Sequence, residues 1–256
     1  MEAPRPRRSL GQNFLRARWV SRLFADWACR YRRLLEIGPG LGALTREVLA
    51  RCPLSELYLV ELDNRLLAGL LTYRLLAPMP EVVHADALSL PLRLEALEAV
   101  YGSIPYNITG PLLAALSLTD RPLPAMLLLQ REVAQRLAAR PGSKSYGRIS
   151  VLVQLAYSVR LGPVVPPSAF QPRPRVYSQI VYLEPQEEAP PAWLRRRVEE
   201  LTRCMFSQRN RLAYKVAARC VGLQGVAAEE LRLRRVYELS PSDFLRLAEN
   251  TGGDEK

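Results

Sequence analysis

The fold is decided by residues 34–45, which read Leu-Leu-Glu-Ile-Gly-Pro-Gly-Leu-Gly-Ala-Leu-Thr. The largely apolar start of this stretch predicts a buried strand, and the glycines after it predict a tight turn that runs into a helix. Gly38, Gly40 and Gly42 would let the backbone approach a ligand closely. The spacing of Gly38, Gly40 and Ala43 also satisfies the dinucleotide-binding pattern G-x-G-x-x-G/A, so the turn is a candidate cofactor site.

Short apolar runs alternate with longer amphipathic stretches on both sides of this turn. The expected strands are residues 34–37, 57–60, 82–84, 99–103, 126–129, 152–161 and 176–183. Strands that alternate with helices predict an α/β fold with a parallel sheet covered on both faces. The last two strands follow each other closely, so we expect them to be an antiparallel addition to the sheet.

The chain is predicted to divide into two domains. Residues 185–193, Pro-Gln-Glu-Glu-Ala-Pro-Pro-Ala-Trp, have no periodicity and predict a linker. Helical spacing follows at 193–221 and 227–233, and Ser240 before Pro241 has the pattern of a helix N-cap. We therefore expect a catalytic domain over residues 1–184 and a small all-α domain over residues 185–256.

The net charge of +11 comes largely from arginine and is uneven along the 256 residues. Residues 1–33 hold nine arginines against Glu2 and Asp26, and residues 203–219 hold five cations and no acid. Such segments favour a polyanionic partner, most often a nucleic acid. We expect the arm at 5–8 to be mobile in the free protein.

The remaining bulk features favour a cytoplasmic protein. No apolar run approaches the roughly 18–20 residues of a membrane span, and the N-terminus lacks the pattern of a secretory signal. The four cysteines form no C-x-x-C pair, which argues against a zinc site and predicts reduced thiols.

Acidic residues near the ends of successive predicted strands separate the possible cofactors. Glu61 ends the strand after the glycine turn, where a carboxylate accepts from both ribose hydroxyls of a nucleotide. Asp86 follows the next strand and is placed to accept from an adenine amino group. Glu36 precedes the glycines, where its carboxylate would suit a cationic ligand. This series fits S-adenosylmethionine better than a dinucleotide.

Residues 103–107, Ser-Ile-Pro-Tyr-Asn, follow the fourth predicted strand at the carboxyl edge of the sheet, where ligands bind. An exocyclic amine of a base is a poor nucleophile because its lone pair is delocalised into the ring. Two acceptors, the Ser103 Oγ and the carbonyl of Ile104 or Pro105, would hold such an amine in line with a methyl sulfonium. Tyr106 would stack on the base.

Together these motifs resemble the ribosomal RNA adenine N6-dimethyltransferase family, of the KsgA-like kind that modifies small-subunit rRNA. The resemblance runs nearly end to end. It comprises residues 11–15 (Gly-Gln-Asn-Phe-Leu), 36–42, Glu61, Asp86, 103–107, 130–137, 141–148, 167–176 and 206–212.

The resemblance implies a Rossmann-like, seven-stranded S-adenosylmethionine methyltransferase sheet. It implies N6-dimethylation of two adjacent adenosines near the 3′ end of small-subunit rRNA, with S-adenosylhomocysteine as product and no metal. The expected setting is a pre-ribosomal small subunit and ribosome biogenesis, with the enzyme a monomer. The implied catalytic residues are Ser103, Ile104, Pro105 and Tyr106. The implied cofactor-binding residues are Gln12, Asn13, Leu15, Gly38, Gly40, Glu61, Leu62, Asp86, Ala87 and Ser103. The implied substrate-binding residues are Tyr106, Asn107, Phe170, Arg209, Arg211, Lys215 and Arg219.

Ser103 departs from the family, which usually has Asn at this position. Serine also offers an oxygen acceptor but is shorter, which puts the rate in question more than the reaction type. The spacing of Arg211, Lys215 and Arg219 predicts one helical face that follows a phosphate backbone.

Three alternatives remain open. One is a large-subunit adenine methyltransferase of the antibiotic-resistance kind. Another is a non-catalytic ribosome-assembly or nucleic-acid-binding factor, to which Ser103 gives weight. The third is an NAD-dependent oxidoreductase, although the sequence has no evident hydride-transfer residues.

Overall fold

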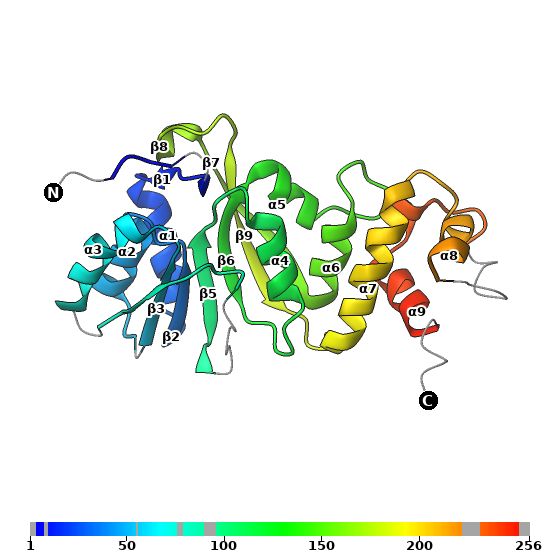
Figure 1. The fold of residues 1–256 in the computed structure, drawn as a ribbon, viewed down its shortest axis with the longest axis horizontal. Coiled ribbons are helices and arrows are strands. Elements are labelled where there is room, and N and C mark those ends of the chain that lie inside the picture. Colours follow the sequence, from blue (N-terminus) through cyan, green and yellow to red (C-terminus); the bar gives the residue numbers. More distant parts are fainter. Residues whose placement is uncertain are drawn as a thin grey trace. The chain divides into compact units, whose positions relative to one another are not determined.

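The computed structural model describes residues 4–7, 10–54, 56–75, 79–89, 96–221 and 231–250. Its main sheet has seven strands in the order β4-β3-β2-β5-β6-β9-β7 (Figure 1). Strands β4, β3, β2, β5 and β6 run parallel to one another, and β9 runs antiparallel to β6. The strands of this sheet are β2 (Arg33–Ile37), β3 (Glu56–Glu61), β4 (Glu81–His84), β5 (Ala99–Ser103), β6 (Ala125–Gln130), β7 (Tyr157–Val165) and β9 (Ser178–Pro185).

The direction in which strands are added reverses at β2. The chain runs from β2 outward through β3 and β4, and returns to place β5 and β6 on the other side of β2. A crevice opens at the carboxyl ends of the strands at such a reversal, and ligands of open α/β sheets bind there. A second, two-stranded sheet pairs β1 (Phe14–Leu15) with β8 (Phe170–Gln171).

Helices connect most of the strands and make up most of the C-terminal part. The α-helices are α1 (Arg18–Ala28), α2 (Ala43–Arg51), α3 (Asn64–Leu71), α4 (Thr109–Ser117), α5 (Arg131–Leu137), α6 (Arg148–Ala156), α7 (Ala192–Met205), α8 (Ala213–Val221) and α9 (Pro241–Asn250). The short 3-10 turns are η2 (Thr72–Leu75), η4 (Pro167–Ala169), η5 (Phe206–Gln208) and η7 (Val236–Glu238). None of the described helices is both long enough and apolar enough to cross a membrane.

One face of the main sheet packs against α1 and α2. Alternate residues of a strand point to the same face, and Leu34, Leu59, Tyr101 and Met126 share a buried cluster with α1 residues such as Phe24. The strand predictions at 34–37, 57–60, 82–84, 99–103, 126–129 and 176–183 are each confirmed to within two residues.

The chain separates into two compact units. The first comprises residues 1–112, 123–134 and 160–184, and the second comprises 113–122, 135–159 and 185–256. The second unit has its own apolar core, in which α6 residues such as Val151 pack with α7, α8 and α9. The Ser240 hydroxyl accepts from the Asp243 N–H at 3.1 Å, as expected of the N-cap of α9. The predicted domain boundary after residue 184 stays a prediction.

The strand predicted at 152–161 is wrong in its first half. Helix α6 continues to Ala156, and β7 begins at Tyr157. The buried side of α6 is mostly apolar, and so are alternate positions of β7 at Tyr157, Val159 and Leu161, so the apolar residues alone do not mark the change. The helix predicted at 193–221 is interrupted, because η5 and a turn separate α7 from α8. The predicted helix at 227–233 lies mostly outside the described residues.

The prediction of reduced thiols is also wrong in this structure, which pairs all four cysteines. Cys29 is bonded to Cys52, and Cys204 to Cys220. Cys29 and Cys52 follow the last residues of α1 and α2, which pack against each other, so the two helix ends bring the sulfurs together.

Candidate functional site

A pocket lies within the first unit, at the carboxyl ends of β2, β3, β4 and β5. Its volume is about 860 Å³, including open solvent at its mouth. The residues lining it are Leu10, Gly11, Gln12, Asn13, Phe14, Ile37, Gly38, Gly40, Val60, Glu61, Leu62, Leu66, Ala85, Asp86, Ala87, Ser103, Ile104, Pro105, Tyr106, Asn107, Ile108, Leu128, Phe170 and Ser178.

The glycine turn forms one side of the pocket. Gly38 and Gly40 have φ angles of +64° and +59°, in the left-handed region that L side chains rarely adopt. A Cβ on Gly40 would also lie 3.1 Å from the ring of Phe14. Glycine is thus required both for the turn and for the close approach of the N-terminal segment.

Glu36 braces this turn from beneath. It is almost completely buried, and its Oε2 accepts hydrogen bonds of 2.8 Å from the hydroxyls of Thr45 in α2 and Tyr101 in β5. Burial raises the pKa of the Glu36 carboxyl to about 7, against these hydrogen bonds, which lower it. The carboxylate therefore joins both flanks of the glycine turn, and its expected proximity to a cationic ligand stays a prediction.

Glu61 and Asp86 line the pocket at the ends of β3 and β4. Glu61 is largely buried, and its two carboxylate oxygens accept from the N–H of Gly40 at 3.0 Å and of Asp63 at 2.9 Å. Burial raises the pKa of Glu61 above its ordinary value. Asp86 Oδ1 accepts from the Leu88 N–H at 2.9 Å, which fixes the carboxylate at the pocket wall.

Residues 103–107 cross the pocket after β5. The Tyr106 hydroxyl shares a hydrogen bond of 3.0 Å with the hydroxyl of Ser178, which holds the ring in place. The Pro105 carbonyl accepts from the Ile108 N–H at 3.2 Å and from the Thr109 hydroxyl at 3.2 Å. These bonds turn the chain directly into α4, so the Pro105 carbonyl is engaged in the turn itself.

The N-terminal motif and Phe170 reach the pocket through the small sheet. Phe14 pairs with Gln171, and Leu15 with Phe170. Because this pairing joins distant parts of the chain, it brings Phe170 to the same pocket as Asn13.

Most of the predicted site residues lie together. The pocket lining contains all the predicted catalytic residues and every predicted cofactor residue except Leu15, which is buried beside it under the glycine turn. Phe170 and Asn107 are also in the lining. These placements leave the assigned roles as predictions.

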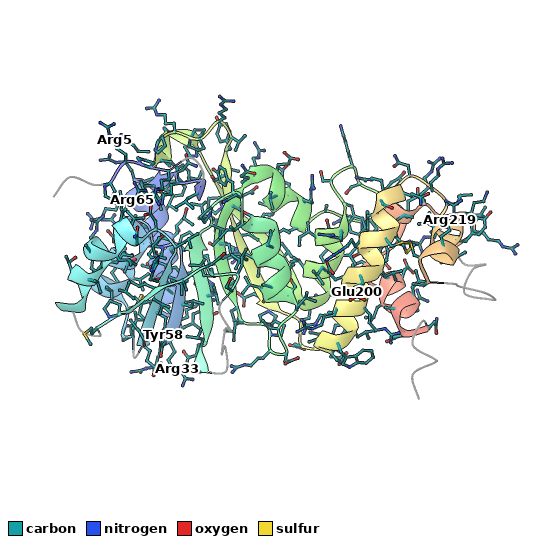
Figure 2. The ribbon with its side chains drawn as sticks, viewed as in Figure 1. Arg5, Arg33, Tyr58, Arg65, Glu200 and Arg219 are labelled. Carbon is teal, nitrogen blue, oxygen red and sulfur yellow. A yellow bond between two sulfur atoms is a disulfide. The ribbon has the colours of Figure 1, made fainter. Side chains whose placement is uncertain are left out.

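The cationic residues predicted to contact RNA, Arg209, Arg211, Lys215 and Arg219, lie in the second unit. The prediction that Arg211, Lys215 and Arg219 share one helical face is wrong for Arg211. Lys215 and Arg219 are exposed on α8, and Figure 2 labels Arg219 there, but Arg211 precedes the helix. Arg209 donates to the carbonyls of Lys144 and Ser143, at 3.2 and 3.4 Å, so it also holds the 140–147 loop.

Sequence reasoning missed two residues at or beside the site, Ser178 and Asp63. Ser178 was missed because nothing in its local sequence marks it as a partner of Tyr106. Asp63, whose carboxylate binds Gln12 and Arg65, stands two residues after Glu61 and was detectable as a second carboxylate at the same strand end. Among the described residues, no three His, Cys, Asp or Glu side chains are grouped to hold a metal ion.

A cationic groove adjoins the pocket, and Phe14 lines both. Its arginines are Arg5, Arg16, Arg18 and Arg46, all exposed. The acid among its described lining residues, Glu47, accepts from Arg18 Nε at 2.7 Å. The groove therefore carries a net positive charge next to the proposed reaction site.

Comparisons with known proteins agree with this geometry. The family model described as ribosomal RNA adenine dimethylase matches residues 4–248. The ribosomal RNA small subunit methyltransferase A of Idiomarina loihiensis is 41% identical over 214 residues, covering 81% of this chain and 74% of the relative. The protein of the same name from Synechococcus sp. (strain RCC307) is 38% identical over 260 residues, covering 94% of each chain.

Solved structures share the fold over nearly the whole chain. A dimethyladenosine transferase from Plasmodium falciparum superposes with a TM-score of 0.77 at 24% identity, covering 93% of this chain and 98% of that one. The 23S rRNA methyltransferase ErmE superposes with a TM-score of 0.64 at 27% identity, covering 93% and 99%. The predicted Rossmann-like methyltransferase fold is confirmed, and the chain belongs to the ribosomal RNA adenine dimethylase family.

Proposed function

We propose that this chain is an S-adenosylmethionine-dependent enzyme that dimethylates N6 of two adjacent adenosines near the 3′ end of small-subunit rRNA. One observation carries the proposal. A single pocket combines the glycine turn, the carboxylates of Glu61 and Asp86, and residues 103–106. The first two parts suit an adenosine-containing cofactor, and the third suits a base that is turned out of its stack.

The donor and acceptor set of the pocket fits S-adenosylmethionine. Glu61 and Asp86 both line the pocket, and we assign Glu61 to accept from two ribose hydroxyls and Asp86 to accept from an adenine amine. Apolar side chains such as Leu62 and Leu66 provide a surface for the adenine ring. When bound, the cofactor supplies a methyl group carried on a sulfonium. The sulfur becomes a neutral thioether when that methyl group is transferred.

The protein's contribution is to position the adenine N6 amine. The Ser103 Oγ accepts one N6 hydrogen bond, and the carbonyl of Ile104 accepts the other. We assign the second bond to Ile104 because the Pro105 carbonyl already accepts from Ile108 and Thr109. Each transfer forms a bond between N6 and the methyl carbon, breaks the bond between that carbon and sulfur, and releases one N6 proton to solvent. The second methyl therefore requires a second molecule of cofactor.

Two aromatic residues hold the target base. Tyr106, whose hydroxyl is fixed by Ser178, stacks on the adenine, and Phe170 closes the other side. Stacking of a base on an aromatic ring contributes about 1–3 kcal/mol. Positioning and electrostatics then supply most of the rate, without a covalent intermediate on the enzyme.

Cationic residues in both units supply the contacts to the RNA backbone. In the first unit these are the arginines of the groove beside the pocket, and in the second unit they are Arg211, Lys215 and Arg219, with Arg209 placing the neighbouring loop. Arginine suits phosphate because its planar guanidinium donates two parallel hydrogen bonds.

The small ribosomal subunit is the proposed setting. The support is that relatives named ribosomal RNA small subunit methyltransferase A share 38–41% identity with this chain over 81–94% of its length. We propose that the enzyme acts as a monomer in the cytoplasm on a pre-ribosomal small subunit, and that its activity belongs to ribosome biogenesis.

The test supplies unmethylated small subunits, large subunits and labelled S-adenosylmethionine, and maps the label. Dimethyladenosine at two adjacent positions of small-subunit rRNA is the expected result. Label confined to the large subunit would select the antibiotic-resistance kind of enzyme. Tight binding of subunits and cofactor without transfer would instead identify a non-catalytic assembly factor.

Ser103 variants test the role of its hydroxyl. Ser103→Ala is expected to lower kcat by about five- to tenfold, because one acceptor of N6 is lost. Ser103→Asn introduces the longer acceptor that is usual in the family, and this variant should have a kcat at least as high as that of the natural protein. Equal turnover of all three proteins would remove the hydroxyl from the mechanism.

A further inference from the structure

The carboxylate of Asp63 ties the N-terminal segment to the strand end that carries Glu61. Its side chain is fully buried. Gln12 Nε2 donates to Asp63 Oδ2 at 2.8 Å, and the Arg7 guanidinium lies 3.9 Å from Oδ1. The Asp63 N–H donates to Glu61 Oε1, so the same residue contacts both the segment and the carboxylate proposed to bind the ribose.

Arg65 completes this contact from the first turn of α3. Its Nε donates to Asp63 Oδ1 at 2.9 Å, and its Nη1 donates to the carbonyl of Arg5 at 3.2 Å. Figure 2 shows Arg5 and Arg65 near each other at the N-terminal side of the first unit. The hydrogen bonds from Arg65 and Gln12 hold the pKa of Asp63 well below its ordinary value, so this carboxylate stays ionised throughout the working pH range.

Two expectations about this segment bear on these contacts, and both stay predictions. The arm at 5–8 is expected to be mobile in the free protein; Arg5 and Arg7 both contact the Asp63–Arg65 pair, while Arg8 lies outside the described residues. Gln12 is expected to bind the cofactor; it lines the pocket, and both ends of its amide also form hydrogen bonds within the protein. Its Nε2 donates to Asp63, and its Oε1 accepts from the Arg7 N–H at 2.8 Å.

Among the described residues of this segment, side-chain contacts hold it in place before β1. The N–H groups of Leu10 and Gln12 both donate to the Arg7 carbonyl, which closes a turn within the segment and leaves its position over the pocket unspecified. That position matters because Leu10, Gly11 and Asn13 line the pocket. A clasp of Arg7, Gln12, Asp63 and Arg65 specifies it.

We propose that Asp63 and Gln12 are positioning residues, which clasp the N-terminal segment over the pocket and thereby determine how tightly the cofactor is held. The inference rests on the proposed function only for the identity of that cofactor. The clasp itself is a property of the protein without any ligand.

A charge exchange between the two residues tests the clasp. Gln12→Glu places a second carboxylate against Asp63, where the present contact is 2.8 Å, and like charges this close repel. Asp63→Asn removes the charge but keeps the acceptor for the Arg65 N–H, because Asn caps a helix as well as Asp does. In the double variant the Asn amide donates to the new Glu, and the Arg65 Nη2, which donates to Asp63 Oδ2 in the natural protein, donates to the new Glu carboxylate instead.

The cofactor readout is the Kd of S-adenosylhomocysteine by calorimetry, without RNA. Gln12→Glu should weaken binding about tenfold or more, and the double variant should return to within about threefold of the natural protein. Gln171→Glu is the matched control, because it makes the same change on β8 beside Arg16, whose Nη1 contacts Gln171 at 2.9 Å. A double variant that binds no better than Gln12→Glu would overturn the proposal.

A second readout does not depend on any cofactor. Trypsin cleavage after Arg7 should be faster in Gln12→Glu and return to the natural rate in the double variant, because cleavage requires the segment to leave the clasp. Equal cleavage of the three proteins would overturn the clasp. Absence of cofactor binding by the natural protein, with cleavage changing as expected, would instead refute the proposed function.

Discussion

The buried carboxyl of Glu36 makes the stability of this protein depend on pH in an unusual direction. Its pKa is about 7 in the folded protein, compared with about 4.3 for an exposed glutamate. The folded state therefore holds a proton that the unfolded state releases in the range between these values. The stability that this proton contributes is fully present below the pKa of Glu36 in the unfolded state. It is lost as the pH rises through the pKa of Glu36 in the folded state.

The size of the loss follows from the two pKa values. One proton changes the free energy of unfolding by about 1.4 kcal/mol per pH unit wherever only the folded state binds it. Between about pH 5.5 and about pH 8.5, Glu36 should therefore cost about 2 kcal/mol. Glu36→Gln removes the titrating group while keeping an oxygen that accepts from Thr45 and Tyr101.

The assay is urea unfolding of both proteins at the two pH values, followed by circular dichroism with the disulfides intact. Subtracting the variant from the natural protein removes the titration of most other groups; the charge of Glu61 also raises the pKa of Glu36, less strongly than burial does. The natural protein should lose about 2 kcal/mol more than the variant at the higher pH. Equal losses would refute the argument that Glu36 titrates in this range.

Three further predictions concern the packing and the charge of the molecule. A Cβ on Gly102 would collide with the carbonyl oxygen of Ile37, so Gly102→Ala should lower the free energy of unfolding in urea by about 2–3 kcal/mol. Gly110→Ala is the control and should cost nothing, because a Cβ there meets no atom within 4 Å. Equal effects of the two variants would contradict the prediction. Arg195 is buried and donates to two carbonyls at 2.7 Å, so Arg195→Met should lower stability by about 2–4 kcal/mol, and an unchanged urea midpoint would count against it. Lys215→Glu should reduce the slope of log Kd for RNA against log salt by about 1 if that residue contacts a phosphate, and an unchanged slope would remove the contact.

The parts of the site that sequence predicts well are those set by local backbone chemistry. Gly38 and Gly40 have positive φ angles, and few other residues tolerate them. Glu61 and Asp86 follow parallel strands whose carboxyl ends meet at one edge, so their positions along the chain were enough to place them in one pocket.

The parts that sequence predicts poorly depend on contacts between distant segments. The partner of Tyr106 is Ser178, 72 positions away, and the partner of Gln12 is Asp63, 51 positions away. The cysteines were misjudged for the same reason, because Cys29 and Cys52 meet only once α1 and α2 have packed. At Tyr157, one apolar run continues from helix into strand, and composition does not mark the change.

The pairing of β1 with β8 has a consequence for the timing of synthesis. The contacting residues Arg16 and Gln171 are 155 positions apart in the chain. A ribosome that adds about 5–20 residues per second needs roughly 8–30 s to make the intervening segment. Strand β1, which leaves the ribosome early, therefore has no pairing partner until β8, near the end of the first unit, has been synthesised. Until β8 emerges, the growing chain has the glycine turn but lacks the part of the pocket lining that Phe170 forms beside Phe14. A chain truncated before residue 170 therefore lacks a complete pocket.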